Sequence, residues 1–220
     1  MDGVLIANET IDYVRRKKKN GLIFKVDFEK AYDNVDWSFL IDSLKKMGFG
    51  HKWVKWIEEC LISAKMSVLV NGSPTEEFPM RKGLRQGDPL APFLFLIVVE
   101  GLHILVSEAE KKRLFEGIKV GKLETSVSHL QYADDAVFFG KWNVTNLKNL
   151  LKILECFQKL SGLKINVGKS KMYGLGILEE EVARWASSVG CGYGKFPFEY
   201  LGLPVGVSMK RKENNIGERQ

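Results

Sequence analysis

The chain has 220 residues, of which 45% are hydrophobic and 27% are charged, and its formal net charge is +6. This composition is typical of a folded globular protein and excludes a disordered or fibrous chain. The length allows one large domain with a sizeable core. The positive charge is compatible with a polyanionic partner.

Cysteines, termini and apolar runs limit the cellular context. The three cysteines are far apart and odd in number, which fits neither a disulfide framework nor a zinc site. The start of the chain, MDGVLIANE, lacks the features of a signal peptide. The longest apolar run covers residues 90–99, about half of what a membrane span requires. We expect an intracellular protein, in the nucleus or cytoplasm, with no membrane partner.

The first half of the chain predicts a strand, two helices and a hairpin. Their ranges are 21–28 for the strand, 37–47 and 51–64 for the helices, and 66–80 for the hairpin. Asp36 can cap the first helix, and Gly48 can end it. The Asn71-Gly72 pair is a strong signal for a two-residue hairpin turn.

The second half begins with a loop, GLRQGDPLAP, that opens a long helix. The expected elements are a helix over 90–114, a hairpin over 126–140, an amphipathic helix over 147–160, strands near 163–166 and 171–175, a helix near 179–188 and a strand-turn over 199–206. Strands and helices mix without a regular βαβ repeat. We therefore predict an α+β fold, with helices packed on one face of a mostly antiparallel sheet.

The second hairpin places two aspartates side by side in the stretch QYADDAVFFG. Asp134 and Asp135 repel one another, and burial of either would make this worse. One interpretation is a solvated Asp-Asp turn. The other is a divalent-cation site, because Mg²⁺ binds a few carboxylates together with water and substrate phosphates.

A third carboxylate favours the metal interpretation. Asp27 lies near the end of the apolar strand LIFKVDF, where an unpaired charge is costly. If this strand lies beside the second hairpin, Asp27, Asp134 and Asp135 meet at one edge. Three carboxylates can hold two Mg²⁺ ions about 4 Å apart, the arrangement that supports phosphoryl transfer.

Two other motifs were considered. DFEKAYDNVDW resembles a calcium loop, but Ala31 and Tyr32 occupy positions where an EF-hand needs a ligand and a glycine. NVGKS resembles a phosphate-binding loop, but position 163 is leucine instead of the required first glycine. We reject both.

Five motifs in order and spacing resemble one family, the reverse transcriptases of non-LTR (LINE-type) retrotransposons, especially those of plants. They are FKVDFEKAYDNVDW, GLRQGDPLAPFLF, YADDAVFF, SGLKINVGKSK and YLGLPVG. The resemblance implies a right-hand polymerase palm over residues 1–207, with incomplete fingers, no thumb, and a truncated, disordered tail over 208–220. Mobile-intron maturases have similar palm motifs, but the second and fifth motifs fit the LINE type better.

The resemblance also implies an activity, a cofactor and partners. The activity is RNA-directed DNA synthesis, in which dNTPs are added to the 3′-hydroxyl of a DNA primer on an RNA template. Asp27, Asp134 and Asp135 would bind two Mg²⁺ ions, with Mn²⁺ as a substitute. An alternative is an inactive, truncated relic that retains at most weak nucleic-acid and metal binding.

Further residues receive roles from the same resemblance. Lys169 would protonate the leaving pyrophosphate, and Tyr32 would crowd the 2′-position of the sugar. The other nucleotide-binding positions are Phe28, through its backbone amide, Gln86, Gly87 and, with a weaker match, Arg85. The primer-binding turn comprises Tyr200, Leu201 and Gly202.

Two features allow more than one interpretation. The basic run from Arg15 to Lys19 fits a nucleic-acid contact, a nuclear address or a solvated surface. Trp37, Trp53 and Trp56 could stack on bases, but at helical spacing tryptophans more often belong to a core.

Overall fold

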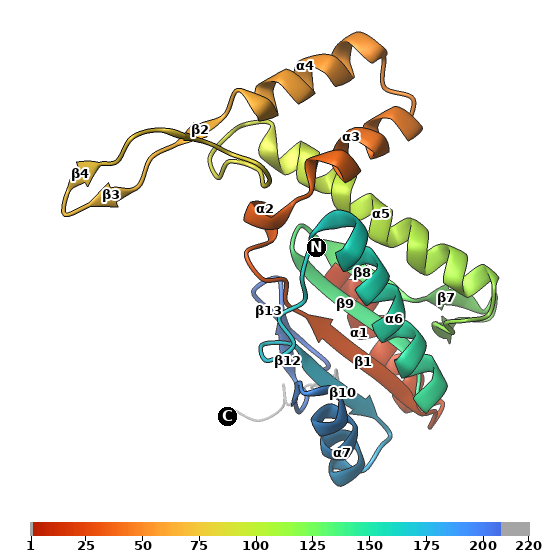
Figure 1. Ribbon diagram of the computed structural model, residues 1–220. Coiled ribbons are helices and arrows are strands. Elements are labelled where there is room, and N and C mark those ends of the chain that lie inside the picture. Colours follow the sequence, from red (N-terminus) through yellow and green to blue (C-terminus); the bar gives the residue numbers. More distant parts are fainter. Residues whose placement is uncertain (1, 208–220) are drawn as a thin grey trace, which may run out of the picture.

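A five-stranded sheet forms the centre of the computed structural model, which describes residues 2–207 (Figure 1). β1 (Gly21–Val26) lies between β9 (Asp135–Lys141) and β10 (Lys171–Leu175) and is antiparallel to both. β8 (His129–Tyr132) pairs antiparallel with β9, and β11 (Gly192–Tyr193) pairs parallel with β10. The predicted α+β fold with a mostly antiparallel sheet is confirmed.

Both faces of this sheet are covered, because each of the two alternating sets of side chains in β1 contributes to a buried apolar cluster. Leu22, Phe24 and Val26 pack on one face, against α5 (Ala91–Lys111), α6 (Val144–Ser161) and α7 (Glu179–Val189). Ile23 packs on the opposite face, against α1 (Asp2–Arg16) and the hairpin of β12 (Phe198–Tyr200) and β13 (Leu203–Val205). The prediction of helices on one face is therefore wrong for α1, which lies behind the sheet in Figure 1.

A short helical unit follows β1 and leads away from the sheet. It consists of α2 (Ala31–Asn34), α3 (Trp37–Lys46) and α4 (His51–Ile62). The Asp36 side chain accepts a hydrogen bond from the Phe39 N–H at 2.9 Å, which confirms the predicted cap. Leu40 and Leu44 are buried on one side of α3, as their spacing of four residues on a helix allows.

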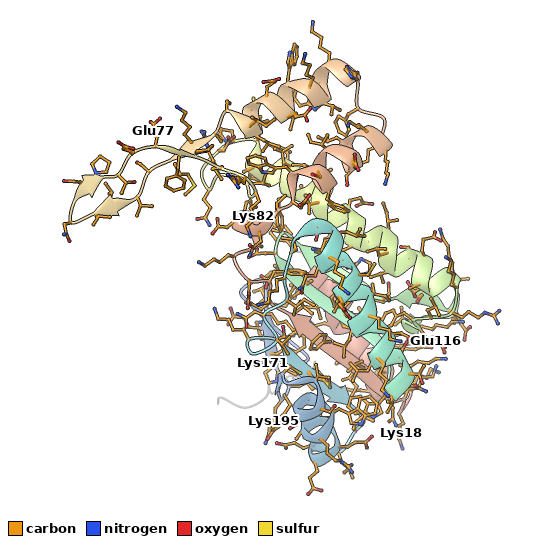
Figure 2. All side chains as sticks on the ribbon, in the orientation of Figure 1. Lys18, Glu77, Lys82, Glu116, Lys171 and Lys195 are labelled. Carbon is orange, nitrogen blue, oxygen red and sulfur yellow. The ribbon has the colours of Figure 1, made fainter. Side chains whose placement is uncertain are left out.

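The predicted first hairpin forms an arm that projects from the body (Figure 1). β2 (Lys65–Met66) pairs with β5 (Phe78–Pro79), and β3 (Leu69–Val70) pairs with β4 (Ser73–Pro74). Asn71 and Gly72 form the tip with φ angles of 50° and 80°, as the hairpin turn requires. In Figure 2, Glu77 lies on the arm, and Lys82 lies where the arm returns to the body.

Two parts of the second half differ from expectation. An additional hairpin, β6 (Ile118–Val120) with β7 (Thr125–Val127), precedes β8. The strand expected near 163–166 is reduced to a single bridge between Phe28 and Ile165, because the chain turns immediately into the Asn166 turn. The expected tail over 208–220 lies outside the described residues.

The long helix α5 occupies residues Ala91–Lys111 within the predicted 90–114. By length and composition it could cross a membrane. Its Phe95, Val98, Leu102 and Val106 side chains belong to the core beneath the sheet, which is the pattern of a core helix in a folded domain.

A pair of imidazoles connects α5 to β8. His103 Nδ1 and His129 Nε2 lie 3.2 Å apart. Burial, followed by the charge of His103, lowers the pKa of His129 to about 4, although the Glu110 carboxylate acts in the opposite direction. In the folded chain the His129 ring therefore stays neutral at pH values where an unfolded chain would protonate it.

We expect acid to destabilise the fold through His129. The unfolded chain binds this proton below about pH 6.5, whereas the folded chain binds it only near its lowered pKa, so the free energy of unfolding decreases as the pH falls. Between about pH 7 and about pH 5 the decrease is about 2 kcal/mol. Urea titrations at both pH values measure it. His129→Gln is expected to reduce the difference in unfolding free energy between the two pH values. His51→Gln, which changes an exposed histidine, is the control and should leave this difference as it is in the parent chain. An equal difference in the two variants would contradict this role of His129.

Candidate active site

The sheet register brings two of the predicted carboxylates together. The last pair of the β1–β9 ladder joins Val26 to Ala136. The next residue on β1's side is Asp27, and the residue before Ala136 is Asp135. Residues that face each other across an antiparallel pair have Cβ atoms about 5 Å apart. Two carboxylates that are far apart in sequence thus become neighbours at the end of the sheet.

The third carboxylate lies in the turn between β8 and β9. Tyr132 pairs with Asp135, which leaves Ala133 and Asp134 as a two-residue loop. Ala133 has a φ of 49°, a conformation that such tight hairpins require. Asp134 is exposed, whereas Asp27 and Asp135 are half-buried.

The three carboxylates differ in their partners. Lys25 Nζ lies 3.9 Å from Asp135 Oδ1 and also donates a hydrogen bond to the Glu199 carbonyl at 2.9 Å. Across residues 2–207, the side chains of Asp27 and Asp134 make no ion pair. Within the same residues, no three acidic, histidine or cysteine side chains are grouped closely enough to hold a metal ion. The backbone makes the carboxylates neighbours, but their side chains do not converge.

The charges of two of these carboxylates act on nearby tyrosines. Burial raises the pKa of Tyr32, and the charge of Asp134 raises it further. Burial also raises the pKa of Tyr200 to about 12, with a smaller contribution from Asp135. Asp134 is therefore close to the Tyr32 segment, and Asp135 is close to the β12–β13 hairpin.

Tyr32 is held in place by its ring and its backbone. The ring stacks on Phe95 of α5, with centroids 4.5 Å apart and planes inclined by 13°. The Tyr32 carbonyl accepts a hydrogen bond from the Leu84 N–H at 2.7 Å. This bond connects the segment after β1 with the loop before α5, two of the motifs that the sequence singled out.

The loop before α5 presents its predicted nucleotide-binding residues to solvent. Arg85, Gln86 and Gly87 are exposed, and Gly87 has a φ of 88°. Asp88 is half-buried, and its carboxylate accepts a hydrogen bond from the Leu90 N–H just before α5 at 2.8 Å. A Cβ at Gly83 would lie 2.6 Å from the Asp33 carbonyl oxygen, so glycine allows the loop to approach α2.

The turn that contains Lys169 packs against the backbone of Asp27. The buried Ser170 Oγ accepts a hydrogen bond from the Asp27 N–H at 3.2 Å and donates one to the Asn166 carbonyl at 2.8 Å. The Asn166 N–H donates to the Asp27 carbonyl at 2.8 Å. The Lys169 side chain is exposed. Sequence reasoning missed Ser170 and Asn166 as positioning residues, and their only signal was a pair of small polar residues between two predicted strands.

Phe28 anchors the same region in the core. Its ring is buried and meets Phe157 of α6 edge to face, with centroids 6.4 Å apart. On one side of Phe28, Asp27 is hydrogen-bonded to the Lys169 turn, and on the other the Glu29 N–H donates to the Lys164 carbonyl at 2.8 Å. In the described part of the chain, no residue accepts a hydrogen bond from the Phe28 N–H.

The predicted primer turn lies next to the aspartate hairpin. Tyr200 pairs with Leu203, so Leu201 and Gly202 form a two-residue loop with φ angles of 53° and 73°. A cavity of about 460 Å³ separates this turn from β8. Its lining consists of Gly3, Leu130, Gln131, Tyr132, Tyr200 and Leu201.

The sequence is similar to one family and to several known proteins. The profile of the family described as "Reverse transcriptase (RNA-dependent DNA polymerase)" matches residues 2–205. The "Transposon TX1 uncharacterized 149 kDa protein" of Xenopus laevis is 29% identical over 81% of this chain, which covers 13% of that relative. The "Retrovirus-related Pol polyprotein from type-2 retrotransposable element R2DM" of Drosophila melanogaster is 29% identical over 79% of this chain, which covers 16% of it.

Two solved telomerase structures share the fold of this chain. Telomerase from Candida albicans superposes with a TM-score of 0.64 and 11% identity, over 92% of this chain and 32% of the telomerase chain. Apo telomerase from Candida tropicalis superposes with a TM-score of 0.59 and 18% identity, over 81% of this chain and 35% of the telomerase chain. At such low identity these likenesses establish the fold alone.

Proposed function

The chain belongs to the reverse transcriptase (RNA-dependent DNA polymerase) family, and we propose that its three neighbouring carboxylates form a two-metal centre for RNA-directed DNA synthesis. The proposal is supported mainly by the β1–β9 pairing, which brings Asp27 beside Asp135. Asp134, in the adjoining turn, adds the third oxygen ligand group. The relatives that carry retrotransposon names support the same origin.

The residues at this edge fit a hard divalent cation. Carboxylate oxygens are the ligands that Mg²⁺ prefers, and Mn²⁺ accepts the same kind of ligand. Asp27 and Asp134 have no ion-pair partner within residues 2–207, so no ion pair would have to break before they ligate an ion. Two ions bound there would neutralise charge on the phosphates and activate the attacking primer hydroxyl.

Several residues would bind and orient the incoming dNTP. The Phe28 amide would donate to a triphosphate oxygen, and Gln86 and Gly87 would line the pocket, with Arg85 as a further cation. Tyr32, fixed by its stacking on Phe95, would exclude a 2′-hydroxyl. Lys169 is an exposed ammonium on the turn bonded to Asp27 and would give a proton to the leaving pyrophosphate oxygen.

The DNA primer and the RNA template would lie between the aspartate hairpin and the β12–β13 hairpin. The turn Tyr200, Leu201 and Gly202 borders a cavity beside β8. A primer end held there would be close to Asp135, because Lys25 contacts both the Asp135 carboxylate and the carbonyl of Glu199, the residue before Tyr200. Such positioning lowers the barrier by converting an encounter into a reaction between preoriented groups.

Primer extension with the purified chain tests the proposal. A labelled DNA primer annealed to RNA should be extended when dNTPs and Mg²⁺ are present and remain unextended when the metal is chelated with EDTA. Mn²⁺ should restore synthesis. If the folded chain binds Mg²⁺ and RNA but extends no primer with either metal, the inactive-relic alternative is correct.

A further inference from the structure

The stretch between Asp42 and Glu58 contains no acidic residue, and we refer to residues 43–57 as the α3–α4 corner. It comprises the end of α3, the connecting loop and most of α4. Its lysines are Lys45, Lys46, Lys52 and Lys55. Four lysines without an acid give this short segment a charge of +4, whereas the whole chain carries +6.

The same corner exposes large apolar and aromatic side chains. Phe49, Trp53 and Trp56 are 40%, 41% and 53% exposed. The opposite side of α4 is already buried through Val54 and Ile57, so the tryptophans are not needed for packing. Of the two interpretations that the sequence allowed for these tryptophans, a place in the core does not apply to Trp53 and Trp56.

Trp37 differs from these two tryptophans. Its ring is half-buried against the core, and its Nε1–H donates to the Gly83 carbonyl at 2.7 Å. It therefore serves to pack α3 against the loop before α5. The contrast separates a structural tryptophan from two that are presented to solvent.

Cations and rings lie together in the corner. Lys52 Nζ lies 5.2 Å from the centroid of the Trp56 ring. Among the ion pairs formed within residues 2–207, none includes a lysine of the corner. Unpaired cations beside exposed rings are what single-stranded nucleic acid requires, since bases stack on the rings and phosphates attract the cations.

We propose that the α3–α4 corner binds single-stranded RNA away from the catalytic edge, with bases stacked on Trp53 and Trp56. The proposal rests on the proposed function in taking template RNA as the partner. α4 ends at the arm, so the corner lies at the opposite end of the α3–α4 pair from the arm (Figure 1). The bound RNA is an unpaired part of the template, outside the primer duplex. A protein partner is less suited, because four unpaired lysines without an acid favour a polyanion.

Fluorescence anisotropy with a labelled oligouridine of about 10 nucleotides tests this site. We expect Trp53→Ala/Trp56→Ala to weaken binding at least about tenfold, and Trp53→Phe/Trp56→Phe to weaken it less because a ring remains. Replacing the four lysines of the corner by glutamine should reduce the dependence of affinity on salt by about 0.7 in logarithmic slope per lysine that contacts a phosphate. A fully paired RNA of the same length should bind without dependence on the two tryptophans.

Matched variants make the outcome specific. Lys148→Gln/Lys152→Gln, which changes exposed lysines on α6, should leave the affinity and its dependence on the tryptophans unchanged. Unaltered RNA affinity of a folded Trp53→Ala/Trp56→Ala chain would overturn the proposal. Unaltered affinity together with lost self-association on a sizing column would assign the corner to a protein interface. Binding that requires the tryptophans in a chain that extends no primer would support the corner and refute only the proposed activity.

Discussion

Primer extension is expected to fall at least about a thousandfold in Asp27→Asn and in Asp134→Asn, which corresponds to about 4 kcal/mol of activation free energy. Asparagine preserves the size of the side chain but removes the negative charge that a divalent ion requires. Neither carboxylate has an ion-pair partner in residues 2–207, so the loss should act on catalysis alone. The free energy of unfolding should stay constant or increase, because one of the repelling charges is removed.

Asp135→Asn should have a smaller effect than the other two substitutions. Asp135 is half-buried, and Lys25 Nζ lies 3.9 Å from its Oδ1, so part of its charge is already compensated. Asp33→Asn is the control, because Asp33 is an exposed carboxylate on α2 and should leave extension unchanged. Extension rates and their dependence on Mg²⁺ concentration, measured for the four variants, test this order of effects. Equal losses in all four would contradict a metal site built on Asp27 and Asp134.

Local signals in the sequence predicted those elements that local physics determines. The Asp36 cap, the Asn71-Gly72 turn and the apolar side of α3 depend on residues only a few positions apart. Apolar β1 and β9 were recognisable as strands, and their pairing followed once both were taken to be part of one sheet. The neighbouring positions of Asp27 and Asp135 could therefore be anticipated without coordinates.

Contacts over long sequence distances could not be anticipated in the same way. Ser170 accepts a hydrogen bond from Asp27 across 143 positions, and a serine in a short turn gives no local sign of this bond. The position of α1 on the second face of the sheet depends on the apolar side chains of several strands together. The exposure of Trp53 and Trp56 was hidden because helical spacing looks the same on a buried and on a solvent-facing side of a helix.

Gly162→Ala is expected to destabilise the fold by at least about 3 kcal/mol and to reduce primer extension. Gly162 ends α6 with a φ of 78°, where alanine costs about 1 kcal/mol. A Cβ there would also overlap the Asn34 carbonyl oxygen of α2. This contact is with backbone, so either α6 or the segment that carries Tyr32 must move. Urea titration measures the stability, and the extension assay measures the displacement of the site.

Gly190→Ala is the matched control for this substitution. Gly190 ends α7 with a φ of 83°, and the nearest atom to an added Cβ is Val167 Cγ1 at 3.9 Å, an ordinary contact. Its alanine variant should lose only the backbone contribution of about 1 kcal/mol and retain primer extension. The difference between the two variants isolates the close approach of α6 to α2. Similar losses of stability in both would show that this approach does not position the Tyr32 segment.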